Sequence, residues 1–275
     1  IRFDPLSQIF KVMILLAGAI TALMATGDSS INRLGEFHLV IIVATLGGTL
    51  LASAADLIMI FVALETVSIP LYVLAAFSRN SEKSAESGLK YFLFGSFASA
   101  IMLYGFSLLY GFSGTTSLDG IAAALTAGDT VQTITPVLVA MVFVIVGIGF
   151  KISMAPFHFW TPDVYEGAPT PVTAFVSVAS KAASFALLVR LLIGVFPESV
   201  AIDGQSIQNF WVNMIVFLSV VTMTLGNILA LRQKNVKRML AYSSIAQAGY
   251  TLIGVAAIQS GGSLAVGSIT FYMFM

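Results

Sequence analysis

Residues 55–77 decide the fold, because the stretch ADLIMIFVALETVSIPLYVLAAF is long and apolar enough to cross a bilayer as one helix. Its internal charge, Glu65, lies near the middle of the stretch. A charged group at the bilayer centre costs on the order of 3 kcal/mol on insertion scales. Glu65 is therefore a candidate functional residue, and so are Lys90, Lys151 and Lys181, which lie in similar apolar runs.

The composition of the whole chain agrees with this interpretation. Of 275 residues, 58% are hydrophobic and 9% are charged, against about 25% charged in soluble domains. Because the apolar runs are continuous rather than alternating, the sequence predicts an all-α polytopic membrane protein and not a barrel. The 13 basic and 13 acidic residues balance, so nothing indicates nucleic-acid binding. The lack of cysteine excludes thiolate-held zinc, iron–sulfur clusters and disulfides within the chain.

The predicted organisation is a single transmembrane domain over residues 1–275. At about twenty residues per span, helices are expected at 5–25, 36–53, 55–77, 84–112, 135–154, 171–193, 209–231, 239–259 and, truncated, from about 262. This makes about nine helices. The chain opens on Ile1, and its last apolar run, from about residue 262, is too short for a span. We therefore expect a fragment of a longer chain.

The loop charges predict an orientation. Basic residues gather on one side of the spans, at Arg33, Arg79, Lys83, Arg232, Lys234, Lys237 and Arg238. The other side receives Asp56, Asp119, Asp129, Glu198 and Asp203, with Arg2, Lys11 and Arg190 near helix ends. By the positive-inside rule the basic side faces the cytoplasm, or the matrix or stroma of an organelle.

Glu65 and Lys90 form the first candidate constellation. From the loop near Asn80, helical rise puts the two residues within about 7 Å of each other in depth. An ion pair there would lower the cost of burial and couple the two proton affinities. The alternative is a static pair that only holds two helices together. Pro70 weakens the same helix, and Ser68 is placed to take up freed hydrogen bonding.

Lys151 and Lys181 form the second constellation. Lys151 follows Gly147 and Gly149, whereas Lys181 lies mid-helix among alanines and serines. A buried amine of this kind can load and release a proton. The alternative is that each side chain snorkels to the interface, which suits Lys151, near its helix end, better than Lys181.

Between these lysines, residues 154–171 hold four prolines and several aromatic residues. We expect this segment to be irregular, to lie near the membrane interface and to line water. His158 in this segment is a candidate proton relay, because imidazole changes charge near neutral pH. The alternative is a structural interfacial histidine. The sequence indicates no metal site, because its carboxylates do not cluster.

Several motifs, taken in order, resemble a known family. They are ALETVSIPLYVL (63–74), LKYF (89–92), FKIS (150–153), HFWTPDVYEG (158–167), SK (180–181) and KRMLAYSSI (237–245). The chain resembles the antiporter-like membrane subunits of proton-pumping NADH:quinone oxidoreductase, respiratory complex I. Among these it is most similar to subunit N, called subunit 2 in organelles.

The resemblance implies a bundle of about fourteen helices with inverted five-helix repeats, each holding a broken helix. The first repeat would cover 36–193, and the second would begin at 209–275. Glu65 and Lys90 would be the half-channel pair, Lys151 the central lysine on the broken helix, and Lys181 the connecting lysine. His158 completes our set of site residues.

The resemblance also implies partners and a location. The chain itself would do no redox chemistry and bind no cofactor, because quinone, FMN and iron–sulfur clusters would belong to partner subunits of the membrane and redox arms. It would sit in a bacterial inner membrane or an organellar membrane. The lysine of the second broken helix would lie beyond Met275, and Gln247 stands where many relatives carry histidine. Two rivals are a subunit of a multi-subunit sodium/proton antiporter and a structural scaffold.

Overall fold

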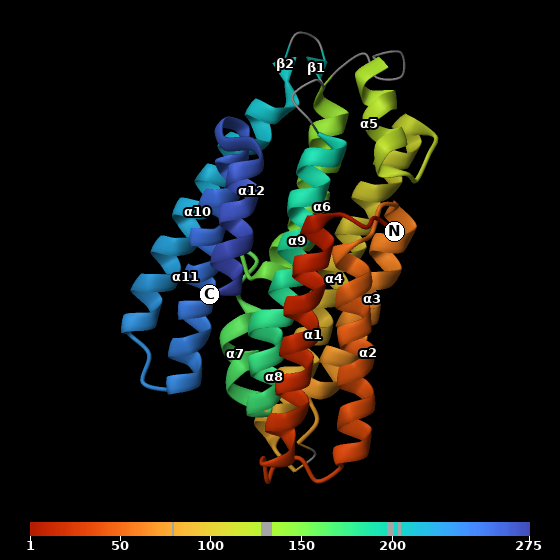
Figure 1. Cartoon of the computed structure of the whole chain (residues 1–275). Helices are drawn as coiled ribbons and strands as arrows, with labels where there is room; N and C mark the ends of the chain where they lie inside the picture. The colour runs from red at the N-terminus through yellow and green to blue at the C-terminus, as the bar shows by residue number, and fades with distance from the viewer. Residues whose placement is uncertain (79, 128–133, 197–200, 203–204) are drawn as a thin grey trace.

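The computed structural model describes residues 1–275 except 79, 128–133, 197–200 and 203–204. It is a bundle of long helices, shown in Figure 1. The helices are α1 (Pro5–Thr26), α2 (Leu34–Ala52), α3 (Leu57–Ala75), α4 (Glu82–Ser113), α5 (Leu118–Ala127), α6 (Thr135–Ile152), α7 (Trp160–Gly167), α8 (Thr170–Phe175), α9 (Lys181–Val195), α10 (Ile207–Leu231), α11 (Val236–Ala256) and α12 (Ile258–Phe274). Strands β1 (Ala201–Ile202) and β2 (Gln205–Ser206) form an antiparallel hairpin.

The predicted all-α membrane fold is confirmed, and each predicted span contains helix. Within the described residues, seven spans are long and apolar enough to cross a membrane, with α8 to α9 counted as one. The last helix was expected from about residue 262, and α12 has a non-helical Gly262 (φ 49°) four residues after its start. The helices α5 and α7 were not predicted, because both are short and lie in the polar stretches between spans.

Side-chain caps fix where several helices begin. Asp4, Asp56, Ser81 and Asn235 precede α1, α3, α4 and α11, and each accepts a hydrogen bond from a backbone N–H of the first turn. These residue types are favoured before helices because the first turn has no internal acceptors. The caps place these helix starts up to three residues away from the starts predicted by hydropathy.

The most buried helix is α9, in which every residue from Lys181 to Leu192 is buried. It packs against α1, α2, α5 and α6. In Figure 1, α10, α11 and α12 stand together on the side opposite α2 and α3. A helix that is apolar all round belongs at the centre of a bundle, so Lys181 and Arg190 on α9 are charges carried into the interior.

A π-helical segment, η1 (Val176–Ser180), joins α8 to α9 and ends at the residue before Lys181. The sequence predicts one regular helix over 171–193, without this π-helical segment. Single π-helical turns inside α-helices are rare and are found mostly at functional sites.

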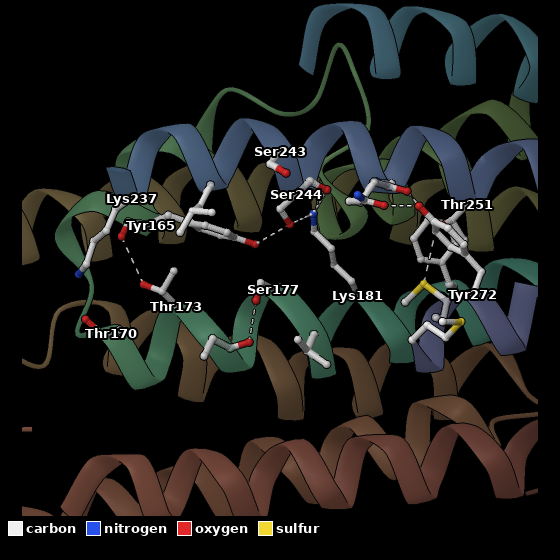
Figure 2. Close-up of a pocket in the computed structure, with 18 residues that line it drawn as sticks. Tyr165, Thr170, Thr173, Ser177, Lys181, Lys237, Ser243, Ser244, Thr251 and Tyr272 are labelled. Atoms are coloured by element: carbon white, nitrogen blue, oxygen red, sulfur yellow. Dashed lines mark hydrogen bonds between the residues drawn. The ribbon is translucent and has the colours of Figure 1, made fainter. Parts of the chain in front are cut away.

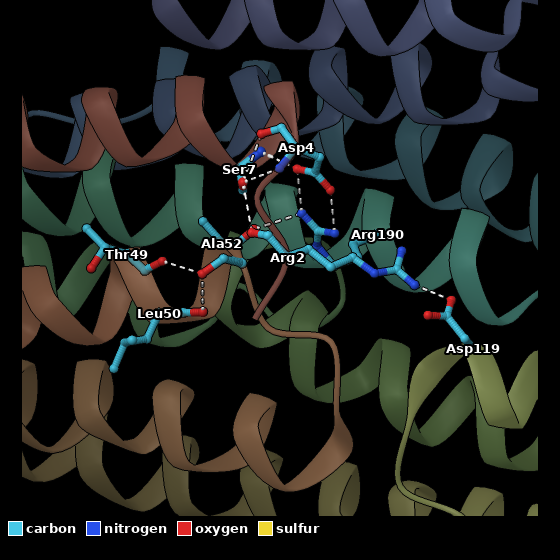
Figure 3. Close-up of polar contacts among 9 residues, drawn as sticks. Arg2, Asp4, Ser7, Thr49, Leu50, Ala52, Asp119 and Arg190 are labelled. Carbon is cyan, nitrogen blue, oxygen red and sulfur yellow. Dashed lines mark hydrogen bonds and ion pairs between the residues drawn. The ribbon is translucent and has the colours of Figure 1, made fainter.

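Arg190 was expected near a helix end and lies five residues before the end of α9, where it is buried and pairs with Asp4 (Figure 3). Two guanidinium nitrogens donate to the Asp4 carboxylate at 2.8 and 3.0 Å, and one also donates to the carbonyl of Ala52 at 3.2 Å. These hydrogen bonds from Arg190 hold the pKa of the Asp4 carboxyl well below its usual value, although burial opposes the shift. The contacts tie α9 to the start of α1 and the end of α2.

Some predictions remain untested. Arg79, Asp129, Glu198 and Asp203, on which part of the orientation argument rests, lie outside the described residues. The membrane orientation and the division into two repeats stay predictions.

Candidate functional site

Lys151 lies in the last turn of α6, and its side chain is buried, with 4% of its surface exposed. Its ammonium donates a hydrogen bond to Ser68 Oγ of α3 at 2.6 Å, and Ser68 Oγ donates in turn to the carbonyl of Leu64 at 2.5 Å. The snorkelling alternative does not hold for Lys151, because its side chain is buried and its ammonium binds Ser68 inside the bundle. Among the described residues, Lys151 makes no ion pair.

Helix α6 ends at Ile152, one residue after Lys151. Ser153 has a left-handed backbone (φ 62°), and regular helix resumes only at Trp160. Trp160 Nε1 donates to the carbonyl of Phe150 at 3.0 Å, which fixes α7 to the end of α6. The prediction that residues 154–171 are irregular is therefore wrong in part. The helix α7 forms because Pro162 lies in its first turn, where a missing N–H and a fixed φ are tolerated.

Glu65 and Lys90 do not form the predicted ion pair. Glu65 Oε1 accepts a hydrogen bond from Ser99 Oγ at 2.7 Å, whereas Lys90 Nζ binds Glu86 and Asp163. Since Ser99 is nine residues after Lys90 on α4, Lys90 lies about 14 Å nearer the helix start than the level of Glu65. The predicted depth difference of about 7 Å was too small, because it assumed a symmetric loop.

Lys90 belongs instead to a group of ionised side chains that we call the charge cluster: Lys83, Glu86, Lys90, Asp163, Glu166 and Arg238. Lys90 binds Asp163 at 2.5 Å and Glu86 at 2.6 Å. Arg238 binds Asp163 at 2.5 Å and Glu166 at 3.1 Å, and Lys83 binds Glu166 at 2.7 Å. The cluster joins α4, α7 and α11.

Two carboxyl groups of the charge cluster, those of Asp163 and Glu166, have lowered pKa values. Hydrogen bonds from Lys83 hold the pKa of Glu166 below its usual value, and Arg238 adds to the effect. Burial raises the pKa of Asp163, but hydrogen bonds from Lys90 and Arg238 outweigh burial and lower it overall. This cluster was not predicted from the sequence. Its signal was the spacing of Asp163 and Glu166, which lie three residues apart and share one helix face.

Lys181, at the start of α9, donates hydrogen bonds to the carbonyl and the hydroxyl of Ser244 on α11, both at 2.7 Å. The Ser244 hydroxyl also lies 3.5 Å from Tyr165 Oη. Figure 2 shows Lys181 reaching across a cavity toward Ser244. Only 4% of Lys181 is exposed, so the snorkelling alternative is wrong for this residue also.

The cavity beside Lys181 has a volume of about 710 Å³ and lies between α8, α9, α11 and α12. Thr170 and Lys237 lie at one end in Figure 2, and Thr251 and Tyr272 lie at the other. Its hydroxyl-bearing lining includes Thr173 and Ser177. Gln247 also lines it and accepts a hydrogen bond from Tyr272.

His158 lies in the break between α6 and α7 and is buried. Its ring stacks on Phe159 with 4.7 Å between ring centroids, and its Nδ1 has no hydrogen-bond partner among the described residues. Its role as a proton relay stays a prediction. Within the described ranges, no group of three or more His, Asp or Glu side chains could hold a metal ion.

This arrangement can hold and pass charge inside an apolar bundle. Lys151 and Lys181 are buried amines whose hydrogen-bond partners are neutral oxygens, and hydroxyl groups lie beside both. The fold and the site together define a polytopic α-helical membrane protein with ionisable side chains in its spans.

Comparisons with known proteins agree with this class. Residues 54–275 match the family described as "NADH:quinone oxidoreductase/Mrp antiporter, TM". The chain is 48% identical to the NAD(P)H-quinone oxidoreductase subunit 2 of Nostoc punctiforme, over 99% of this chain and 50% of that protein. It is 43% identical to the NADH-quinone oxidoreductase subunit N of Moorella thermoacetica, over 99% of this chain and 55% of that protein.

A solved structure is also similar. The respiratory complex I of Thermus thermophilus with bound aureothin contains a chain that is 36% identical, with a TM-score of 0.73, over 100% of this chain and 58% of that chain. The protein therefore belongs to the family of membrane subunits shared by NADH:quinone oxidoreductase and Mrp antiporters. It spans about half the length of the curated relatives that it matches.

Proposed function

We propose that this chain belongs to a proton-translocating membrane-arm subunit, of the N or 2 type, of an NADH:quinone oxidoreductase. The observation that carries the proposal is the pair of buried lysines, Lys151 and Lys181, each bound to neutral oxygens inside membrane-spanning helices. A buried amine without a bound carboxylate can change its protonation state, whereas a buried ion pair holds its proton.

The proposed path uses the predicted site residues in a modified order. Lys151 takes up a proton beside Ser68, and Lys181 carries it onward beside Ser244. Glu65, held by Ser99, acts as a separate acidic group near Lys151, and His158 relays protons at the break. Lys90 acts through the charge cluster, in which it holds Asp163 of α7 in place.

Proton transfer would be driven by quinone reduction elsewhere. In this proposal the quinone, FMN and iron–sulfur clusters belong to partner subunits, and this chain contributes no redox chemistry of its own. Its partners are the other membrane-arm subunits and the lipid bilayer. The repeats over 36–193 and from 209 onward would each supply one half of the proton path.

The rival is a subunit of a sodium/proton antiporter, since the matching family covers both kinds of complex. Relatives that are 43% and 48% identical are quinone oxidoreductase subunits by name, which favours the first proposal. Proton pumping driven by NADH and independent of sodium would support it. A strict sodium requirement without redox coupling would support the antiporter.

The proposal is tested by replacing Lys151 with methionine in the assembled complex. Methionine keeps the apolar stem and removes the titrating amine, so proton pumping in inside-out vesicles should fall markedly while assembly persists. A Lys181→Arg complex should also lose proton pumping, because arginine stays protonated and cannot pass the proton on.

Lys234→Met is the matched control, because Lys234 is an exposed residue of the α10–α11 loop. It should pump at the parent rate. Normal pumping by an assembled Lys151→Met complex would overturn the proposal.

A further inference from the structure

The ammonium of Lys151 is surrounded by aromatic rings. Its Nζ lies over the rings of Tyr72, Phe150 and Tyr91, at 5.3, 5.4 and 5.7 Å from the ring centroids. All these distances are within the range of about 6 Å over which a cation is attracted to a ring face. The rings come from α3, α4 and α6, so the lysine is enclosed from several directions.

The rings are held in place by other contacts. Tyr91 stacks on Trp160 with 4.5 Å between centroids and an interplanar angle of 9°, and it meets the edge of Tyr72 at 4.9 Å. A Cβ atom added at Gly95 would lie 2.1 Å from the Tyr72 hydroxyl oxygen. Gly95 therefore leaves the space into which the Tyr72 ring fits.

The faces of these rings, rather than their hydroxyl groups, act on Lys151. The hydroxyls of Tyr72 and Tyr91 are buried, and neither has a hydrogen-bond partner among the described residues. A positive charge removed from water needs compensation. The ring quadrupole supplies it without adding a carboxylate that would hold the proton.

We propose that Tyr72, Tyr91 and Phe150 form an aromatic cage that positions the Lys151 ammonium and sets how firmly it holds its proton. The inference rests on the proposed function and adds positioning residues to it. The cage attracts the ammonium and not the neutral amine. It thus favours loading of Lys151, while leaving the side chain free to release its proton.

The other charged groups on elements packed near Lys151 do not replace the cage. Glu65 on α3 accepts a hydrogen bond from Ser99 and makes no ion pair with Lys151 among the described residues. Lys90 and Asp163 bind each other, and Lys181 is bound to Ser244. His158 is the nearby titratable group of the break, and its imidazole is common to every variant below.

The test compares variants at Tyr72 in the assembled complex. The ratio of proton pumping to NADH oxidation is measured against pH, so that effects on the redox sites cancel. Tyr72→Phe keeps the ring face and should keep the parent profile. Tyr72→Leu removes the face, so the alkaline limb of pumping should move to lower pH by about one unit.

Two further measurements keep the test decisive if Tyr72→Leu fails to assemble. Phenylalanines with increasing fluorination, placed at position 72, withdraw electrons from the ring face with little change in shape. The alkaline limb should move stepwise with fluorination. Gly95→Ala should shift it in the same direction by displacing the Tyr72 ring, whereas Gly111→Ala, on the same helix with nothing within 4 Å of the added Cβ, should not.

An unchanged profile across the fluorinated series would overturn the cage. This outcome is separate from failure of the proposed function, which would show as normal pumping by Lys151→Met. If Lys151→Met is inactive and the series has no effect, only the cage is refuted.

Discussion

The pair of Asp4 and Arg190 predicts an asymmetric response to mutation. Arg190 has 3% of its side chain exposed, whereas the Asp4 side chain has 35% exposed. Replacing Asp4 with asparagine keeps the helix cap, since asparagine is as good a cap as aspartate, but leaves the arginine charge buried without a counterion. Replacing Arg190 with methionine leaves a carboxylate that water still reaches. The first change should therefore cost more than the second.

The magnitude follows from the burial of each partner. Breaking a buried ion pair costs about 3 to 5 kcal/mol. Since Asp4 is partly hydrated and asparagine still accepts one hydrogen bond, we expect about 2 kcal/mol for Asp4→Asn. Arg190→Met should cost less than about 1 kcal/mol. The double variant should lie near the parent, because no unpaired buried charge remains.

Amide hydrogen exchange in the assembled complex measures this effect, because the pair anchors the start of α1. At about 1.4 kcal/mol for each tenfold change, residues 8–12 should exchange about 30-fold faster in Asp4→Asn. Residues 21–25 at the other end of α1 should be unchanged. Equal effects of the two single variants, or a larger effect of Arg190→Met, would refute the reasoning.

The pH dependence of this effect has a defined sign. The pKa of Asp4 is lowered in the folded state by its hydrogen bonds from Arg190. Its stabilisation is therefore fully present above the usual aspartate value of about 3.9 and is lost as the pH falls through the lower folded value. The difference between parent and Asp4→Asn should not change between about pH 5 and pH 8.

Two other predictions concern helix contacts. The first uses double-mutant cycles on the thermal stability of the assembled complex. The effects of Lys90→Met and Asp163→Asn should couple by about 1 kcal/mol, while the effects of Lys90→Met and Glu65→Gln should be additive. The reverse pattern would restore the pairing predicted from sequence. Gly226→Ala should lower that stability by about 2 kcal/mol, since its Cβ would lie 2.7 Å from the backbone nitrogen of Ala246. Gly267→Ala, with nothing within 4 Å, should match the parent, and equal losses in both would exclude a steric cause.

The spans could be predicted from sequence because a bilayer imposes one length and one polarity on each. Lys151 and Lys181 could be found for the same reason, since a charge in an apolar run is visible without any knowledge of packing. Helical rise alone placed Lys90 too close to the level of Glu65, because the loop between α3 and α4 is not symmetric. What it could not give was the partner, because Asp163 is 73 residues away in the chain and reaches Lys90 from a helix that was expected to be irregular.

The aromatic cage was hidden for a related reason. Tyr72 and Tyr91 lie in runs where aromatic residues are common, and each by itself is an ordinary core residue. Only the packing of α3 and α4 against the end of α6 turns their faces toward one ammonium. Arg190 lies near the end of α9, as expected, but its burial was not predicted, because hydropathy does not show whether a neighbouring segment covers a residue.

The π-helical turn before Lys181 affects the direction in which the Lys181 side chain points. A π turn holds one residue more than an α turn, and one residue corresponds to about 100° of rotation around a helix. Everything after Ser180 is therefore rotated relative to α8 by that surplus residue, while the path of the helix axis continues. Lys181 points at Ser244 because the chain was offset by a single position. The number of residues in the turn, rather than the type of any side chain, sets the direction of Lys181.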